Sequence, residues 1–95
     1  MTTRVVHLRS PEWAATPEAG RVRIDRRTKW GNLYRIGPHG ERDQVIADYR
    51  AWLRRQPDVV AAARAELRGK VLGCWCAPLA CHGDVLAAIA EGEAP

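Results

Sequence analysis

Residues 41–56 carry the clearest structural pattern of the chain, an apolar stripe with the period of an α-helix. Acidic residues precede the stripe and arginines follow it, which complements the helix dipole. Pro57 suits the first position of a second helix over residues 57–69, and Gly69 suits its end. The sequence therefore predicts a helical hairpin. The stripe residues predicted to face the core are Val45, Ile46, Tyr49, Trp52 and Leu53.

Short apolar runs flank this hairpin on both sides. Residues 4–9 and 21–25 alternate apolar and polar side chains, and residues 70–75 form a short run that reads as a buried strand. Residues 11–20 hold two prolines and a glycine, so we expect a loop there, and residues 26–40 form a longer one. Residues 83–92 predict a last helix that ends at Gly92.

This order of elements limits the architecture. Because helices separate the first and third strands, those strands should run parallel. The sequence predicts an α/β fold, a small two-layer or three-layer domain with about three helices and a short, at least partly parallel sheet of about three strands. With 95 residues, we expect one domain over residues 1–92 and a frayed tail over residues 93–95.

Composition narrows the cellular setting and the partners. No apolar run approaches the roughly 18–20 residues of a membrane span, and the N-terminus has no hydrophobic signal core. We therefore expect a cytoplasmic protein without a membrane partner. Fifteen Lys and Arg against eleven acidic residues favour an anionic partner only weakly, and neither a cofactor nor an oligomeric state is indicated.

Three segments with polar or reactive side chains follow or end the predicted strands. His7 lies near the end of the first strand, "RRTKWGN" follows the second, and "CWCAPLACHG" contains the end of the third and the loop behind it. Ligands on such sheets bind outside the carboxyl ends of the strands. The three stretches are thus predicted to share one edge and to line a cleft.

The Cys/His cluster permits three interpretations. Cys74, Cys76, Cys81 and His82 are four residues of the kind that bind zinc, but C-x-C-x4-C-H departs from common zinc spacings, so no metal is the preferred hypothesis. A reactive thiol is the second: Cys81 precedes the last helix, whose N–H groups and dipole would lower its pKa and, with Gly83, cradle an anion. Simple burial is the third, and we favour it for Cys74.

The loop after the second strand offers ligand-binding groups. Arg26, Arg27 and Lys29 are suited to phosphate, Trp30 to stacking on a base or sugar, and Gly31 to a close approach of the backbone. Asn32 fits either a ligand contact or a turn. Burial of Trp30 in the core is an equally good interpretation.

The two boxes together resemble a known family. K-W-G-N, at Lys29 to Asn32, and C-W-C-x-P-x-x-C-H, at Cys74 to His82, are similar to the motifs of the small, uncharacterised family catalogued as domain of unknown function 4326, whose members are often bacteriophage or bacterial proteins. Where members usually have a proline after the Asn and a Gly-Arg pair in the second strand, this chain has Leu33 and Asp25-Arg26. The resemblance supplies no activity.

The residues support one leading hypothesis of function. It is an enzyme that binds a nucleotide-like or other phosphate-bearing small molecule in the cleft, with Cys81, His82 and Cys76 as catalytic residues. A nucleic-acid-binding or host-interaction module and a structural zinc-binding domain are the alternatives. The predicted ligand-binding residues are His7, Arg27, Lys29, Trp30, Gly31, Asn32 and Gly83.

Overall fold

A three-stranded parallel sheet forms the centre of the computed structural model, which describes residues 2–95. The strands are β1 (Arg4–His7), β2 (Arg21–Arg23) and β3 (Val71–Cys74), in the order β1-β3-β2. β3 pairs in parallel with both neighbours. This confirms the predicted α/β class and the predicted direction of the first and third strands.

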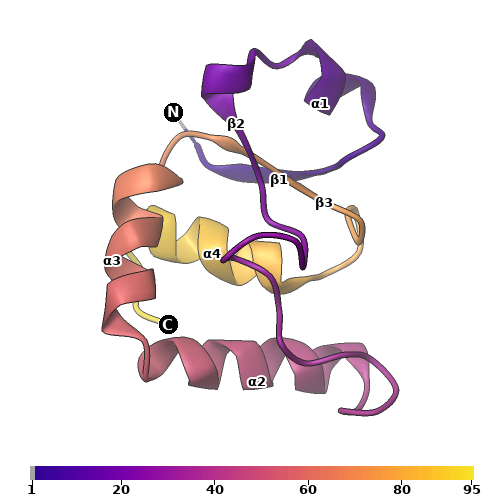
Figure 1. Ribbon diagram of the computed structural model, residues 1–95, viewed down its shortest axis with the longest axis vertical. Coiled ribbons are helices and arrows are strands. Elements are labelled where there is room, and N and C mark those ends of the chain that lie inside the picture. Colours follow the sequence, from indigo (N-terminus) through magenta and orange to yellow (C-terminus); the bar gives the residue numbers. More distant parts are fainter. Residues whose placement is uncertain (1) are drawn as a thin grey trace.

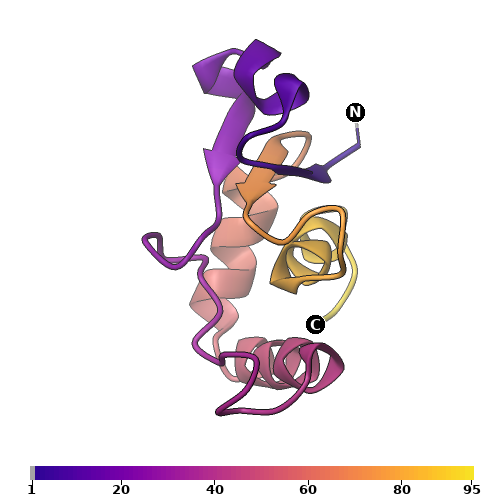
Figure 2. The same ribbon diagram turned by 90° about the vertical axis from the view of Figure 1, so that its right-hand side faces the viewer.

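The helices cover the sheet unequally. α1 (Pro11–Ala15) and the 3-10 helix η1 (Glu18–Gly20) lie on one side of it, and α3 (Pro57–Glu66) and α4 (His82–Ala90) lie on the other (Figures 1 and 2). α2 (Arg42–Arg54) is the element farthest from the strands, where it packs on α3 and α4. α4 contacts β1 and β3 directly and therefore covers one face of the central strand.

The segment predicted as a loop over residues 11–20 contains α1 and η1, so the structure has four α-helices where three were expected. The Ser10 side chain accepts a hydrogen bond from the N–H of Trp13, and Pro11 occupies the first turn. Ser at the N-cap followed by Pro is a helix start. Pro17 is itself the N-cap of η1, without a side-chain cap. The prolines begin helical turns here, whereas the sequence interpretation treated them only as breakers.

All four residues of β3 are buried, and they divide between the two faces of the sheet. Leu72 and Cys74 belong to the main hydrophobic core on the side of α4. On the other face, Gly73 lies against the side chains of Leu8 and Trp13. The absence of a side chain at Gly73 is what allows α1 to lie close to the central strand.

The apolar stripe of α2 is narrower than predicted. Tyr49 and Leu53 are completely buried, but Trp52 is only half-buried and stacks on Tyr49 with ring centroids 5.8 Å apart. The reason is that α2 packs on two helices and not beneath the sheet, so one flank of its stripe remains at the surface. The Tyr49 hydroxyl donates to the carbonyl of Trp30 at 2.7 Å and so joins the helix to the loop after β2.

Outside these elements, two further observations complete the description. Within residues 2–95, no helix combines the length and the apolar character needed to cross a membrane.

The last residues, predicted to fray, carry carbonyls that accept hydrogen bonds: Arg64 donates to Glu93 and Arg54 to Pro95. They therefore lie against α2 and α3.

Replacing Gly73 with alanine is expected to lower the free energy of unfolding by about 1–3 kcal/mol. A Cβ there would lie 2.6 Å from both Leu8 and Trp13, so these side chains would have to move. Urea unfolding followed by tryptophan fluorescence measures the effect. Gly20→Ala is the control, because its Cβ would meet only Thr16 at 3.4 Å, and a change below about 0.5 kcal/mol is expected. Equal losses in the two variants would contradict the packing of α1 on β3.

Candidate functional site

A pocket of about 230 Å³ opens beside the carboxyl ends of β2 and β3. Three parts of the chain form it: the loop after β2, the start of α2 and the loop from β3 into α4. The residues with polar or aromatic side chains that line it are Asp25, Arg26, Arg27, Asn32, Tyr34, Arg42, Cys74, Trp75, Cys76, Cys81 and His82. Two of the three stretches predicted to meet at this edge therefore do line a common cavity.

Two thiols lie in contact at this pocket. The Sγ atoms of Cys74 and Cys81 are 3.2 Å apart, and both residues are buried. Cys81 is the N-cap of α4: its sulfur accepts the N–H of Gly83, while the carboxylate of Asp84 accepts the N–H of Cys81. The helix start thus fixes one thiol against the end of the central strand.

The pKa values of the two thiols are shifted in opposite directions. Contact with the Cys81 thiol, together with the backbone of Cys76 and Ala77, lowers the pKa of Cys74 to about 6 although burial opposes this. The same interaction and burial raise the pKa of Cys81. This direction is opposite to the one expected for Cys81, because contact with Cys74 and burial outweigh the N–H of Gly83 at the start of α4. Cys74, expected to be only a core residue, is the more acidic thiol.

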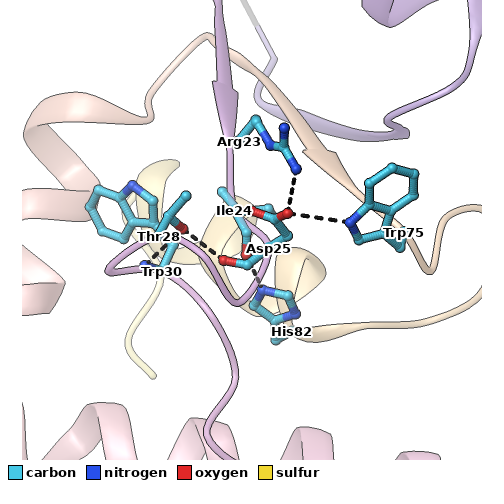
Figure 3. Close-up of polar contacts among 7 residues, drawn as sticks. All are labelled: Arg23, Ile24, Asp25, Thr28, Trp30, Trp75 and His82. Carbon is cyan, nitrogen blue, oxygen red and sulfur yellow. Dashed lines mark hydrogen bonds and ion pairs between the residues drawn. The ribbon is translucent and has the colours of Figure 1, made fainter.

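His82 joins the pocket to the end of β2. Its Nε2 lies 2.7 Å from the carbonyl of Ile24, and since a carbonyl only accepts, Nε2 carries the hydrogen and donates (Figure 3). Burial lowers the pKa of His82, so the ring is neutral at neutral pH. The imidazole lines the same pocket as the thiols but is anchored to the backbone through one nitrogen.

Only one of the two oxygens of the buried Asp25 carboxylate has hydrogen-bond partners. One oxygen, Oδ2, accepts from Arg23 at 2.5 Å and from the indole of Trp75 at 3.2 Å (Figure 3). Oδ1 is buried without a hydrogen-bond partner, and the residue is 6% exposed. Burial would raise the pKa of Asp25, but the two hydrogen bonds and the nearby arginines lower it, so the group is ionised. Sequence reasoning missed Asp25; the only signal was its place in the Asp-Arg pair after β2.

Three arginines line the pocket. Arg26 donates to the carbonyl of Tyr34 and Arg42 to that of Ala80, while Arg27 makes no hydrogen bond to any described residue. Their three positive charges face one carboxylate, that of Asp25, and a neutral imidazole. The lining therefore favours an anion. Arg42 was not singled out from the sequence, because on a helix that begins with charged residues it resembled an ordinary solvated side chain.

Part of the K-W-G-N box serves the fold and not the pocket. Trp30 is 3% exposed and belongs to the core, the second of the two interpretations open for it, and its ring does not line the pocket. Lys29 forms an ion pair with Glu66 and lies over the Trp30 ring. At Gly31 a Cβ would lie 2.6 Å from the Cα of Arg26, so the close approach is to the chain's own backbone.

Asn32 is the member of the box that lines the pocket, and it also holds the loop. Its amide donates to the carbonyl of Val45 on α2 and accepts the N–H of Tyr34. These bonds explain why it is buried. Lys29, Trp30 and Gly31 lie outside the lining, although Lys29 and Gly31 border a second, shallower cavity with Asn32.

His7 and Gly83, predicted to bind the ligand, also lie outside the pocket lining. The His7 ring meets the Trp75 ring edge-on at 5.7 Å, and its Nδ1 accepts the N–H of Arg9. At Gly83 a Cβ would lie 2.7 Å from Ile24, so this glycine permits α4 to approach the sheet. Both residues position neighbours of the site.

The four candidate zinc ligands do not converge. Cys74 and Cys81 are paired, but the hydrogen-bonded nitrogen of His82 points to Ile24. Within residues 2–95 no group of three or more His, Cys, Asp or Glu side chains is arranged to hold a metal ion. A structural zinc site thus has no geometric support in this part of the chain.

Comparison with known proteins places the chain in a family. The model of the domain of unknown function DUF4326 matches residues 6–92. The chain belongs to the DUF4326 family. This match includes all three strands except the first two residues of β1, together with every residue that lines the pocket.

A phage protein is also similar to this DUF4326 chain. The uncharacterized 12.4 kDa protein in the nrdA-td intergenic region of Enterobacteria phage T4 is 39% identical over 72 residues. The match covers 72% of this chain and 65% of the phage protein. No solved structure matches the chain.

The free energy of unfolding is expected to fall as the pH is lowered from about 7.5 to about 5. The pKa of His82 lies below its usual 6.5 in the folded protein, so the unfolded chain takes up this proton first and stability is lost below that value. Urea unfolding of the wild type and of His82→Gln at both pH values tests this. The variant should lose less stability, because the other titrating groups are common to both proteins. Identical pH dependence would contradict a buried neutral imidazole.

Proposed function

We propose that the DUF4326 pocket binds a phosphate-bearing small molecule, nucleotide-like in its chemistry, and that the protein is an enzyme acting on it. One observation carries the proposal: the buried, ionised Asp25 has an oxygen without a partner in the wall of a pocket lined by three arginines. The pocket thus offers an acceptor and an anion site together. Nucleotides carry hydroxyl or N–H donors next to phosphate and satisfy both.

The unpartnered oxygen of Asp25 supports a ligand on energetic grounds. A buried polar atom without a hydrogen bond costs about 1–3 kcal/mol, and more when it is charged. Native proteins leave few such atoms, and each calls for a reason. A donor group on a bound ligand that reaches this oxygen would recover this free energy.

The arginines support the phosphate part of the proposal. Guanidinium groups bind phosphate with paired, charge-assisted hydrogen bonds. Arg27 is exposed and has no hydrogen bond to any residue within 2–95, so its donors are available to a ligand. Trp75, which is 49% exposed, is the accessible aromatic ring at the pocket, the role that was expected for Trp30.

The thiols and the imidazole support an enzymatic role. Cys74, Cys76, Cys81 and His82 line the same cavity as the arginines, so a ligand held there lies beside a thiolate and a neutral imidazole. These are the groups of nucleophilic and general-base catalysis. A simple carrier has no need of an acidified thiol in the wall of its pocket.

Calorimetric titration with a panel of nucleoside monophosphates, and with inorganic phosphate, tests the proposal. At least one mononucleotide should bind more tightly than phosphate, because Asp25 gains a donor. Arg27→Gln should weaken that binding by about tenfold, the loss of one charge-assisted hydrogen bond. Asp25→Asn should reduce the preference for the nucleotide over phosphate.

The matched control is Arg55→Gln, which removes the same charge from an exposed residue at the end of α2, outside the pocket. Its affinity should equal that of the wild type. If Arg27→Gln and Arg55→Gln weaken binding equally, the arginines act only through net charge and the pocket is not the site. Tighter binding of an oligonucleotide, with a steep salt dependence, would favour the nucleic-acid-binding alternative.

A further inference from the structure

The two thiols of Cys74 and Cys81 are close enough for disulfide chemistry, which needs no bound nucleotide. Their sulfur atoms are 3.2 Å apart, so a movement of little more than 1 Å would bring them to the roughly 2.05 Å of a disulfide bond. Cys74 ends β3 and Cys81 precedes α4, so two secondary-structure elements hold the sulfur atoms together. Both line the pocket, with Cys74 1% and Cys81 3% exposed, so a small reagent has to reach them through this cavity.

We propose that Cys74 and Cys81 form a redox-active dithiol that exchanges with small anionic disulfides entering the pocket. Cys74 is the attacking thiol and Cys81 the resolving one. The three arginines that line the pocket select a disulfide with negatively charged substituents. The exchange is independent of the proposed nucleotide-like ligand, although both would use the same cavity.

The environment of Cys74 suits it to the first step. Contact with the Cys81 thiol, 3.2 Å away, and the nearby backbone of Cys76 and Ala77 lower the pKa of Cys74 and so stabilise its thiolate. A thiolate whose pKa lies near or below the ambient pH is the form that attacks a disulfide. Cys76 lacks this arrangement, although it also lines the pocket.

The reaction balances in two steps. The Cys74 thiolate attacks one sulfur of the small disulfide RSSR, whose S–S bond breaks to give a mixed disulfide at Cys74 and RS⁻, which takes a proton. Cys81 then loses its proton to the solution and attacks Cys74 Sγ, releasing the second RS⁻. Two protein thiols are oxidised to one disulfide, and RSSR is reduced to two RSH.

The first step also prepares Cys81 for the second. In the dithiol, Cys81 keeps its proton because it donates toward the Cys74 thiolate. In the mixed disulfide that thiolate no longer exists, and the remaining neighbours of the Cys81 sulfur include the N–H of Gly83 at the start of α4. The loss of the neighbouring thiolate, beside an N–H group that stabilises negative charge, favours ionisation of Cys81 only after Cys74 has reacted.

The test uses the full-length protein and two small disulfides of opposite charge, the anionic dithiodiglycolate and the cationic cystamine. Unreacted thiols are blocked with one alkylating reagent, the sample is reduced, and newly exposed thiols are labelled with a second. All three cysteines follow Lys70 with no later Lys or Arg, so they share one tryptic peptide and are distinguished by fragment ions.

We expect the wild type to form the Cys74–Cys81 disulfide while Cys76 stays reduced. Cys81→Ser should stop at a mixed disulfide on Cys74, and Cys74→Ser should form neither the mixed disulfide nor the internal one. Dithiodiglycolate should react at least about fivefold faster than cystamine. Arg27→Gln should reduce that ratio, and Arg55→Gln should leave it unchanged.

Other outcomes would overturn the proposal. If the small disulfide modifies Cys76 while Cys74 and Cys81 remain reduced, the pair is structural. If, in the Cys81→Ser variant, Cys74 reacts no faster than Cys76, Cys74 is not activated. Equal rates for the two reagents would overturn the anionic substrate class. Failure of nucleotide binding with a normal disulfide exchange would affect only the proposed function, since the exchange needs no nucleotide.

Discussion

The parallel pairing of β3 with strands on both of its sides is the constraint on which the rest of the structure depends. It brings the carboxyl ends of β2 and β3 to one edge, where the loops after them form two walls of the pocket. The pairing extends past β2, because the N–H of Ile24 still donates to Gly73. Ile24 then uses its carbonyl to accept His82, so the same residue ties the central strand, the loop and α4 together.

At this edge the neighbouring residues form two groups, those that pack the apolar frame and those that line the pocket. Trp30, Gly31 and Gly83 allow close packing, whereas Asp25, Arg27 and the thiols remain directed to the cavity lining. The Trp30 carbonyl, bonded to Tyr49, fixes the loop on α2. A polar cavity is therefore surrounded by a rigid apolar frame, which is the condition for holding a thiolate, a carboxylate and guanidinium groups at fixed distances.

The sequence was sufficient for the class of fold, the parallel strands and the edge that carries the site, because these follow from periodicity and element order. It was insufficient where partners distant in the chain decide the outcome. In the sequence, Trp30 fits a core residue and a ligand-binding residue equally well. Only its packing under Lys29 and beside α2 distinguishes the two roles. Likewise, the acidity of Cys74 depends on Cys81 and on two N–H groups of a turn, none of which local spacing determines.

The central position of β3 also has a consequence for the order of folding. Arg4 pairs with Val71 and Arg21 with the same residue, so both neighbours of β3 lie some fifty or more residues upstream of it. During synthesis on the ribosome, β1 and β2 have no sheet partner until the last quarter of the chain emerges. The hairpin of α2 and α3, whose contacts are local, can form before then. Sheet, pocket and thiol pair therefore arise together, as a late and cooperative event.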